Sequence, residues 1–173
     1  MRLARDLAAA LSITLLCPSA AFAGAQVYEE LAASVRDRMS AAVADRAAPE
    51  LVFGNQDDGN RWMAEMSRRL AKRVADRKER MDLLRTVHFE AQRAGLDPQL
   101  VLGVIEVESN FRKYAVSRAG ARGYMQVMPF WIKLIGRQGN NLFHLRTNLR
   151  YGCVILKHYL DIENGNVFRA LGR

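Results

Sequence analysis

Glu108 is the residue whose position in this sequence best suits acid catalysis. It lies near the end of an apolar segment in which we predict a helix from Pro98 to Ser109, because Asp97 and Pro98 are residue types that begin helices. At about 100° per residue, Glu108 falls near the middle of the apolar face of that helix, and Glu106 falls on the opposite side. The predicted apolar face consists of Leu100, Val101, Val104, Ile105 and Val107.

Burial at this place would raise the pKa of Glu108. Desolvation disfavours the charged form of a carboxyl group, and the negative end of the helix dipole acts in the same direction. A carboxyl group that keeps its proton can donate it to a substrate as a general acid. The simpler interpretation is a glutamate at a helix end that points to solvent or pairs with Arg112, four residues later.

A turn of small residues follows the predicted helix. Ser109 and Asn110 are suited to ending the helix, and the segment from Ala119 to Gly123 allows a close approach of backbone. Gln126 comes next, with an amide that can both donate and accept hydrogen bonds. Such an amide is suited to ordering a carboxyl group or the N-acetyl group of a sugar.

Taken together and in this order, these residues resemble the lytic transglycosylases with a lysozyme-like fold, of the soluble Slt type. The resemblance covers about Leu83 to the end of the chain and does not reach the N-terminal part. The motifs that carry it are Glu108-Ser109-Asn110-Phe111, Ala115-Val116-Ser117, Gly120-Ala121-Arg122-Gly123-Tyr124-Met125-Gln126-Val127-Met128-Pro129, and Asn148-Leu149 before Gly152.

The resemblance implies an activity on peptidoglycan. Glu108 would be the single catalytic acid and base, and Ser109, Met125, Gln126 and Asn148 would bind the substrate. The bond cleaved would be the β-1,4 bond between N-acetylmuramic acid and N-acetylglucosamine, and the product would carry a 1,6-anhydro end. One carboxylate suffices in this chemistry, because the acetamido group of the sugar stabilises the oxocarbenium centre and its own 6-hydroxyl group attacks. No cofactor is implied.

The end of the sequence departs from the family pattern. Members usually continue after an Ala-Leu-like pair into a Tyr-Asn-x-Gly segment, whose Tyr contacts the catalytic Glu. Here Ala170-Leu171 is followed by Gly172 and Arg173, so we expect a C-terminally truncated domain. A non-catalytic or weakly active peptidoglycan-binding protein is therefore an alternative. Hydrolysis by water, as in goose-type lysozymes, is another.

The first residues are typical of a secretory signal peptide. Arg2 and Arg5 precede an apolar run from Leu7 to Cys17, and a small-x-small cleavage site ends at Ala23. The apolar run is too short to be a stable membrane anchor. We therefore expect residues 1–23 to be removed from an exported protein that resides in the periplasm or at the cell wall.

Cysteine and histidine indicate neither a disulfide framework nor a metal site. Cys153 is the one cysteine left after the signal peptide, and we expect it to be buried on a helix, with an intermolecular thiol as the alternative. His88, His144 and His158 lie far apart and lack the spacing of metal ligands.

The rest of the pattern predicts an all-α protein, a lysozyme-like helical domain preceded by N-terminal amphipathic helices. Apolar residues recur at helical spacing, and no alternating strand follows residue 23. We predict an N-terminal helical segment over 24–80 and the transglycosylase domain over 81–173. Helices are expected at 28–45, 61–80, 81–93 and 124–135 and from Asn148 onward, with Asn148 as a simple cap in the plainest interpretation, and residues 47–60 are expected to form a loop.

The formal charge of +8 favours polyanionic partners. In an exported protein these are more readily the glycan strands of peptidoglycan, whose stem peptides carry carboxylates, than nucleic acid. The basic stretch from Arg68 to Lys78 lacks interleaved aromatic residues, so we interpret it as a solvated helix face. The biological role would be wall remodelling or insertion of a secretion apparatus, with a cell-envelope assembly as a further partner.

Overall fold

The protein is described here from a computed structural model that covers residues 28–44 and 55–173. Within these ranges the fold is all-helical, as predicted, and the pairing of extended backbone is limited to two isolated bridges, Val116 with Arg122 and Arg122 with Val127. The helices are α1 (Ala33–Ala44), α2 (Gln56–Leu70), α3 (Arg77–Arg93), α4 (Pro98–Ser109), α5 (Phe130–Ile135), α6 (Leu145–Ile162) and α7 (Val167–Leu171). The predicted signal peptide, residues 1–23, lies outside the described residues.

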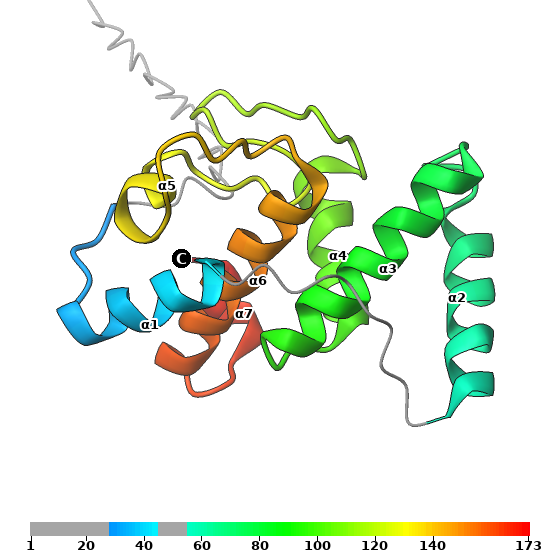
Figure 1. The fold of residues 1–173 in the computed structure, drawn as a ribbon, viewed down its shortest axis with the longest axis horizontal. Helices are drawn as coiled ribbons and strands as arrows, with labels where there is room; N and C mark the ends of the chain where they lie inside the picture. The colour runs from blue at the N-terminus through cyan, green and yellow to red at the C-terminus, as the bar shows by residue number, and fades with distance from the viewer. Residues whose placement is uncertain (1–27, 45–54) are drawn as a thin grey trace, which may run out of the picture.

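Helix α6 is the centre of the packing. It runs through the middle of the molecule, with α3 and α1 beside it and α7 folded back against its end (Figure 1). Leu149, Cys153, Ile155 and Leu156 are all nearly or fully buried. Burial raises the pKa of the Cys153 thiol, so this cysteine is a buried, unreactive side chain on a helix, as the sequence predicts.

An internal ion cluster holds α3 against α6. Glu90 on α3 is 1% exposed and accepts hydrogen bonds from Arg150 on α6 at 2.8 and 3.2 Å. Arg93 donates to the same carboxylate at 3.3 Å. A buried carboxylate is tolerated only when it is paired in this way, so the cluster fixes how the two helices face each other.

The predicted helix over 61–80 is wrong, because the chain breaks it into α2 and the start of α3. The predicted loop over 47–60 is too long for the same region, since α2 already begins at Gln56 with Asn55 as its cap. The Asp76 side chain caps α3 by accepting a hydrogen bond from the Glu79 N–H at 2.6 Å. Asp at the cap and Glu three residues later form a recognised helix-start pattern, which the surrounding basic residues hide.

The Arg80 side chain is buried in the bend between α2 and α3 and does not extend into solvent. It is 9% exposed, and its guanidinium donates to the carbonyls of Val74 and Ala75 and to the hydroxyl of Ser67. These bonds satisfy two carbonyl groups of the bend itself. Arg80 therefore stabilises the break that separates the two helices.

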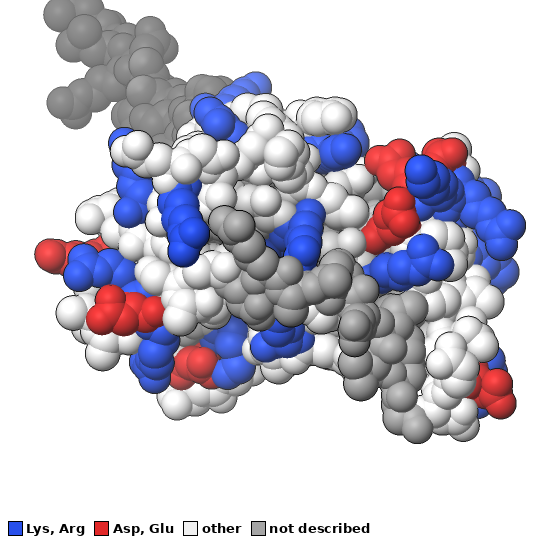
Figure 2. All heavy atoms as spheres, viewed as in Figure 1, with Lys and Arg blue, Asp and Glu red and all other residues white. Residues whose placement is uncertain are grey.

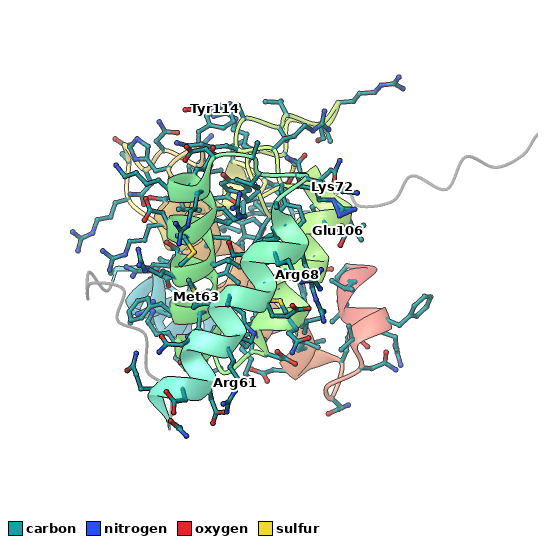
Figure 3. The ribbon with its side chains drawn as sticks, turned by 90° about the vertical axis from the view of Figure 1, so that its right-hand side faces the viewer. Arg61, Met63, Arg68, Lys72, Glu106 and Tyr114 are labelled. Atoms are coloured by element: carbon teal, nitrogen blue, oxygen red, sulfur yellow. The ribbon has the colours of Figure 1, made fainter. Side chains whose placement is uncertain are left out.

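The outer face of α2 is charged but internally balanced. Glu65 accepts hydrogen bonds from Arg68 and Arg69, and Arg61 pairs with Asp58. Basic and acidic side chains accordingly lie together on this side of the molecule in Figure 2, and Figure 3 shows Met63 turned inward from the same helix. The basic side chains from Arg68 to Lys78 are exposed to solvent, as predicted, but they span the break between α2 and α3 and do not form one helix face. No helix in the described ranges is long and apolar enough to span a membrane.

Candidate active site

Helix α4 has the predicted bounds, and its local sequence explains why. The Asp97 side chain caps the helix by accepting from the Gln99 N–H at 2.8 Å, and Pro98 occupies the first helical position. The helix ends where Asn110 adopts a left-handed conformation with φ of 48°. Because residues at both ends of the segment favour starting or ending a helix, the bounds of α4 can be predicted from the sequence.

The buried face of α4 differs from the predicted apolar face at Leu102 and Val107. Val101, Val104 and Ile105 are buried as expected, together with Leu102. Val107, however, is 85% exposed, because it lies about 140° around the helix from the centre of the buried face. Glu108 lies one turn beyond Val104, on the same side of the helix, but it is an exposed residue at the place where α4 leaves the core.

Glu108 lines a narrow cleft with mostly apolar walls. The cleft encloses a volume of about 50 Å³, the space of one or two water molecules. Its lining consists of Val104 and Glu108 from α4, Met125, Gln126 and Val127 from the following loop, Gly152, Ile155, Leu156 and Tyr159 from α6, and Ala170, Leu171 and Arg173 from the C-terminal segment. Glu108 is the one carboxylate among these residues.

Desolvation by these walls raises the pKa of the Glu108 carboxyl group above its ordinary value. Glu108 is nevertheless an exposed residue, so its carboxyl group can exchange a proton with solvent. Within the described residues no hydrogen bond or ion pair engages the carboxylate. Arg112, the alternative partner, instead donates from its Nε to the carbonyl of Ser109 at 3.0 Å. The geometry is that of a free carboxyl group with an elevated pKa.

Glu106 is turned away from the cleft. Its carboxylate pairs with Arg73, in the bend between α2 and α3, and the same guanidinium donates to the side chain of Asn110 at 2.9 Å. Figure 3 shows Glu106 beyond the C-terminal end of α2, near Lys72. Glu106 therefore connects α4 to the bend that follows α2 and does not face Glu108.

Gln126 holds the loop that faces Glu108. Its backbone is left-handed, with φ of 45°, and its side-chain nitrogen donates to the carbonyls of Gly123 at 2.9 Å and Ala115 at 3.2 Å. A left-handed glutamine is uncommon, and the two bonds hold it in place. The amide oxygen has no donor within the described residues and remains available to a ligand. Gln126 is thus both a loop clamp and part of the cleft wall.

Asn148 lies behind the cleft rather than in its lining. It is 1% exposed, and its side-chain oxygen accepts from the Met125 N–H at 2.8 Å. Its side-chain nitrogen donates to the carbonyls of Arg122 at 2.8 Å and Leu142 at 2.9 Å. The interpretation of Asn148 as a helix cap is wrong, because α6 begins three residues earlier, at Leu145.

Two glycines allow this loop to approach α6. A Cβ at Gly123, where φ is 77°, would lie 2.4 Å from the Asn148 side-chain nitrogen. A Cβ at Gly152 would lie 2.4 Å from the sulfur of Met125. Only glycine fits at either position without displacement of the cleft wall.

The structure places three of the predicted site residues in the cleft lining and buries the other two behind it. Glu108, Met125 and Gln126 line the cleft together. Asn148 supports the loop from inside, and Ser109 is 1% exposed, with its hydroxyl donating to the Ile105 carbonyl at 3.1 Å. The α6 and α7 walls were not predicted as site residues. The stripe Gly152, Ile155, Leu156 and Tyr159 has the spacing of one helix face, which in sequence cannot be told from core packing.

No group of three or more His, Cys, Asp or Glu side chains within 28–44 and 55–173 could hold a metal ion. The described lining of the Glu108 cleft provides one carboxylate, the Gln126 amide, the Tyr159 and Arg173 side chains and otherwise mostly apolar walls.

An all-helical domain with a single glutamate in the described lining of its cleft is consistent with the lysozyme-like fold expected from the sequence. Residues 85–172 match the family model of the Transglycosylase SLT domain, and the chain belongs to this family. The match begins within α3 and ends just after α7, so it includes every residue that lines the Glu108 cleft except Arg173.

Curated relatives match this chain over part of their length. The chain is 54% identical over 84 residues to the Membrane-bound lytic murein transglycosylase C of Haemophilus influenzae (strain PittEE), an alignment that covers 41% of this chain and 24% of that protein. The protein of that name from Mannheimia succiniciproducens is 43% identical over 61 residues, covering 32% and 17%. That of Actinobacillus pleuropneumoniae serotype 5b is 59% identical over 39 residues, covering 22% and 11%. The chain thus spans about a quarter or less of these relatives. No solved structure matches.

Proposed function

We propose that this protein is a lytic transglycosylase of peptidoglycan, acting in the cell envelope, in which Glu108 is the single catalytic residue. Membership of the Transglycosylase SLT domain family supports the reaction class. The observation that carries the assignment of Glu108 is its position as the one carboxylate in an apolar cleft, with a raised pKa. The names of the relatives, murein transglycosylases, point to the same substrate.

In the proposed reaction Glu108 first acts as the acid. Its proton passes to the glycosidic oxygen between N-acetylmuramic acid and N-acetylglucosamine, and the C–O bond breaks with the electron pair going to the leaving oxygen. The acetamido group of the muramic acid stabilises the positive charge at its C1. The Gln126 amide oxygen and the Met125 side chain, which line the same cleft, would position that sugar.

Glu108 then acts as the base. The carboxylate formed in the first step removes the proton of the 6-hydroxyl group, and that oxygen bonds to C1 to give the 1,6-anhydro ring. The proton balance closes, because Glu108 ends in the form in which it began. Ordinary glycosidases use a pair of carboxylates, and the absence of a second one in the described cleft favours this route, in which the substrate supplies the nucleophile.

The test is the mass of the soluble products from purified peptidoglycan. Transglycosylation releases muropeptides lighter by one water than those of hydrolysis, so mass spectrometry separates the two reactions. We expect the anhydro products. Products of full hydrolysed mass would instead assign a lysozyme-type reaction.

The narrowness of the cleft favours one second candidate, a peptidoglycan-binding protein with little or no cleavage. A space of about 50 Å³ does not hold a sugar ring, so the glycan must lie across the mouth, or the wall formed by α7 must shift. Sedimentation with insoluble peptidoglycan, without release of soluble fragments, would favour this candidate over the enzyme.

The raised pKa of Glu108 predicts a pH-dependent difference in stability between the wild type and Glu108→Gln. The folded protein holds the Glu108 proton more tightly than the unfolded chain, so this group costs stability as pH rises from its unfolded pKa of about 4.3 through its folded pKa. Glutamine carries no such cost. We expect the free energy of unfolding of Glu108→Gln to rise relative to wild type as pH increases through this window.

Chemical denaturation of both proteins across the window measures this difference. Taking the difference between variants removes the contribution of the other carboxyl groups. A difference that is constant with pH, or that changes in the opposite direction, would show that the cleft does not raise the pKa of Glu108.

A further inference from the structure

A second cavity, larger than the Glu108 cleft, lies between α1, α5 and α6. Its volume is about 480 Å³, and it shares no lining residue with that cleft. The lining consists of Ser40, Ala41, Val43 and Ala44 from α1, Ile135, Gly136, Arg137 and Asn140 from α5 and the loop after it, and Arg146, Thr147, Arg150 and Tyr151 from α6. Because α1 precedes residue 85, this cavity is built partly from outside the segment that matches the family.

The charge of the described lining is positive. Arg137, Arg146 and Arg150 contribute to it, and no Asp or Glu is among the lining residues that the structure describes. In the view of Figure 2, Lys and Arg side chains lie over α5 and the start of α6, and the visible acidic side chains lie toward the edges of the molecule. Within 28–44 and 55–173, the acid that pairs with the lining arginines is Glu90, which lies near both Arg146 and Arg150. These two guanidinium groups therefore share one carboxylate.

Arg146 is the guanidinium that this sharing leaves unsatisfied. Arg150 makes two hydrogen bonds to Glu90, but the Nε of Arg146 lies 3.6 Å from the same carboxylate, beyond hydrogen-bond distance. The Nε and Nη2 atoms of Arg146 are buried and have no hydrogen-bond acceptor in the described part of the chain. Buried donors without an acceptor are costly, and a bound acceptor would remove that cost.

The surrounding groups favour an anion at the same place. Arg146 and Thr147 lie in the first turn of α6, whose cap residue His144 makes no side-chain capping bond, so part of the lining is close to the positive end of the helix dipole. The Tyr151 hydroxyl donates to the Asn140 side chain at 2.6 Å, which joins α6 to the loop after α5 within the lining. Planar guanidinium groups bind two-oxygen acceptors such as carboxylate and phosphate particularly well.

We propose that this cavity is an oxyanion-binding site, in which Arg146 and Arg137 hold a carboxylate or phosphate group against the start of α6. The volume admits more than a single ion, so the group can be carried by a free anion or by the end of a short peptide. The site is independent of the catalytic function proposed above, because it uses other residues and another face of α6.

Isothermal titration calorimetry of the full chain tests this proposal with three probes. These are inorganic phosphate, N-acetylated alanyl-alanine with a free carboxylate, and the same dipeptide with its carboxylate converted to an amide. Tighter binding of the free dipeptide than of phosphate would assign a peptide end, and the reverse would assign a free anion. The amide is expected not to bind. Absence of binding by both phosphate and the free dipeptide at millimolar concentrations would overturn the proposal.

Arg146→Gln and Arg36→Gln form a matched pair of variants. Arg36 is an exposed arginine on α1 that does not line the cavity. Loss of the charged donors at Arg146 is expected to weaken binding by roughly tenfold or more, and loss of Arg36 to leave it unchanged. Equal binding by Arg146→Gln and wild type would show that the anion binds elsewhere.

Ser40→Glu gives a second, independent readout. It places a carboxylate in the cavity wall on α1, opposite the arginines, where it would occupy the site from within the chain. We expect a higher melting temperature and loss of binding of the added anion. A lower melting temperature with unchanged anion binding would contradict an oxyanion site between these walls.

Discussion

Replacement of Glu108 by glutamine is expected to lower the release of anhydro-muropeptides by roughly a thousandfold or more, which is the upper range for loss of a general acid. Glutamine keeps the size of the side chain and its place among the apolar walls, but it has no proton to give to the glycosidic oxygen. It also cannot accept the proton of the 6-hydroxyl group in the second step. Product release from purified peptidoglycan, followed by mass spectrometry, measures the loss.

Glu106→Gln is the matched control for this variant. Glu106 is on the same helix and two residues away, but it faces Arg73 and is about half exposed. A surface ion pair of this kind contributes about 0–1 kcal/mol, so this variant should fold and cleave almost as wild type does. Substantial cleavage by Glu108→Gln, or an equal loss in both variants, would refute the assignment of Glu108 as the catalytic group.

The features of the site that the sequence predicts are those set by local signals. Asp97, Pro98 and Asn110 specify where α4 begins and ends, and the 3.6-residue period then determines which glutamate lies on the side of the cleft. That phase is enough to separate Glu108 from Glu106. The same reasoning misplaces Val107, because the width of the buried face depends on which neighbours pack against it.

The features that the sequence does not predict depend on tertiary contacts or on hidden caps. The predicted helix over 124–135 is shortened to α5 because the backbone of Arg122 and Val127 pairs across the turn, which uses the N–H and C=O groups that a helix would need. Arg80 has the sequence context of a surface residue, yet it is buried in the bend after α2. The cleft walls from α6 and α7 arise only when these helices fold against α4.

Asn148 holds the cleft loop in place although it is buried behind the cleft. Its side chain hydrogen-bonds three backbone groups, those of Met125 in the cleft loop, of Arg122 before it and of Leu142 after it. Asn148 itself lies in the first turn of α6. Because Met125 is part of the cleft lining, the position of the wall opposite Glu108 depends on a side chain that does not itself line the cleft. A substrate contact and a supporting role would be indistinguishable in the sequence.

Replacement of Asn148 by alanine is expected to destabilise the fold by about 2–5 kcal/mol, because three hydrogen bonds are lost and buried backbone groups remain without partners. That is a large part of the stability of a typical domain. Chemical denaturation measures the change. Asn60→Ala, an exposed asparagine within α2, is the matched control and should have little effect on stability.

Asn148→Asp separates hydrogen bonding from shape. Aspartate has almost the same size, but it places an oxygen where the Asn148 nitrogen now donates to the carbonyls of Arg122 and Leu142. The two carbonyl oxygens would then face a carboxylate oxygen and would repel it. The loss of stability should therefore be at least as large as for alanine, and the loop that carries Met125 and Gln126 should be displaced. Cleavage should fall with it even at temperatures where the variant remains folded. Wild-type stability of Asn148→Asp would mean that Asn148 only fills space, and that the loop opposite Glu108 is held by Gln126 and the two glycines alone.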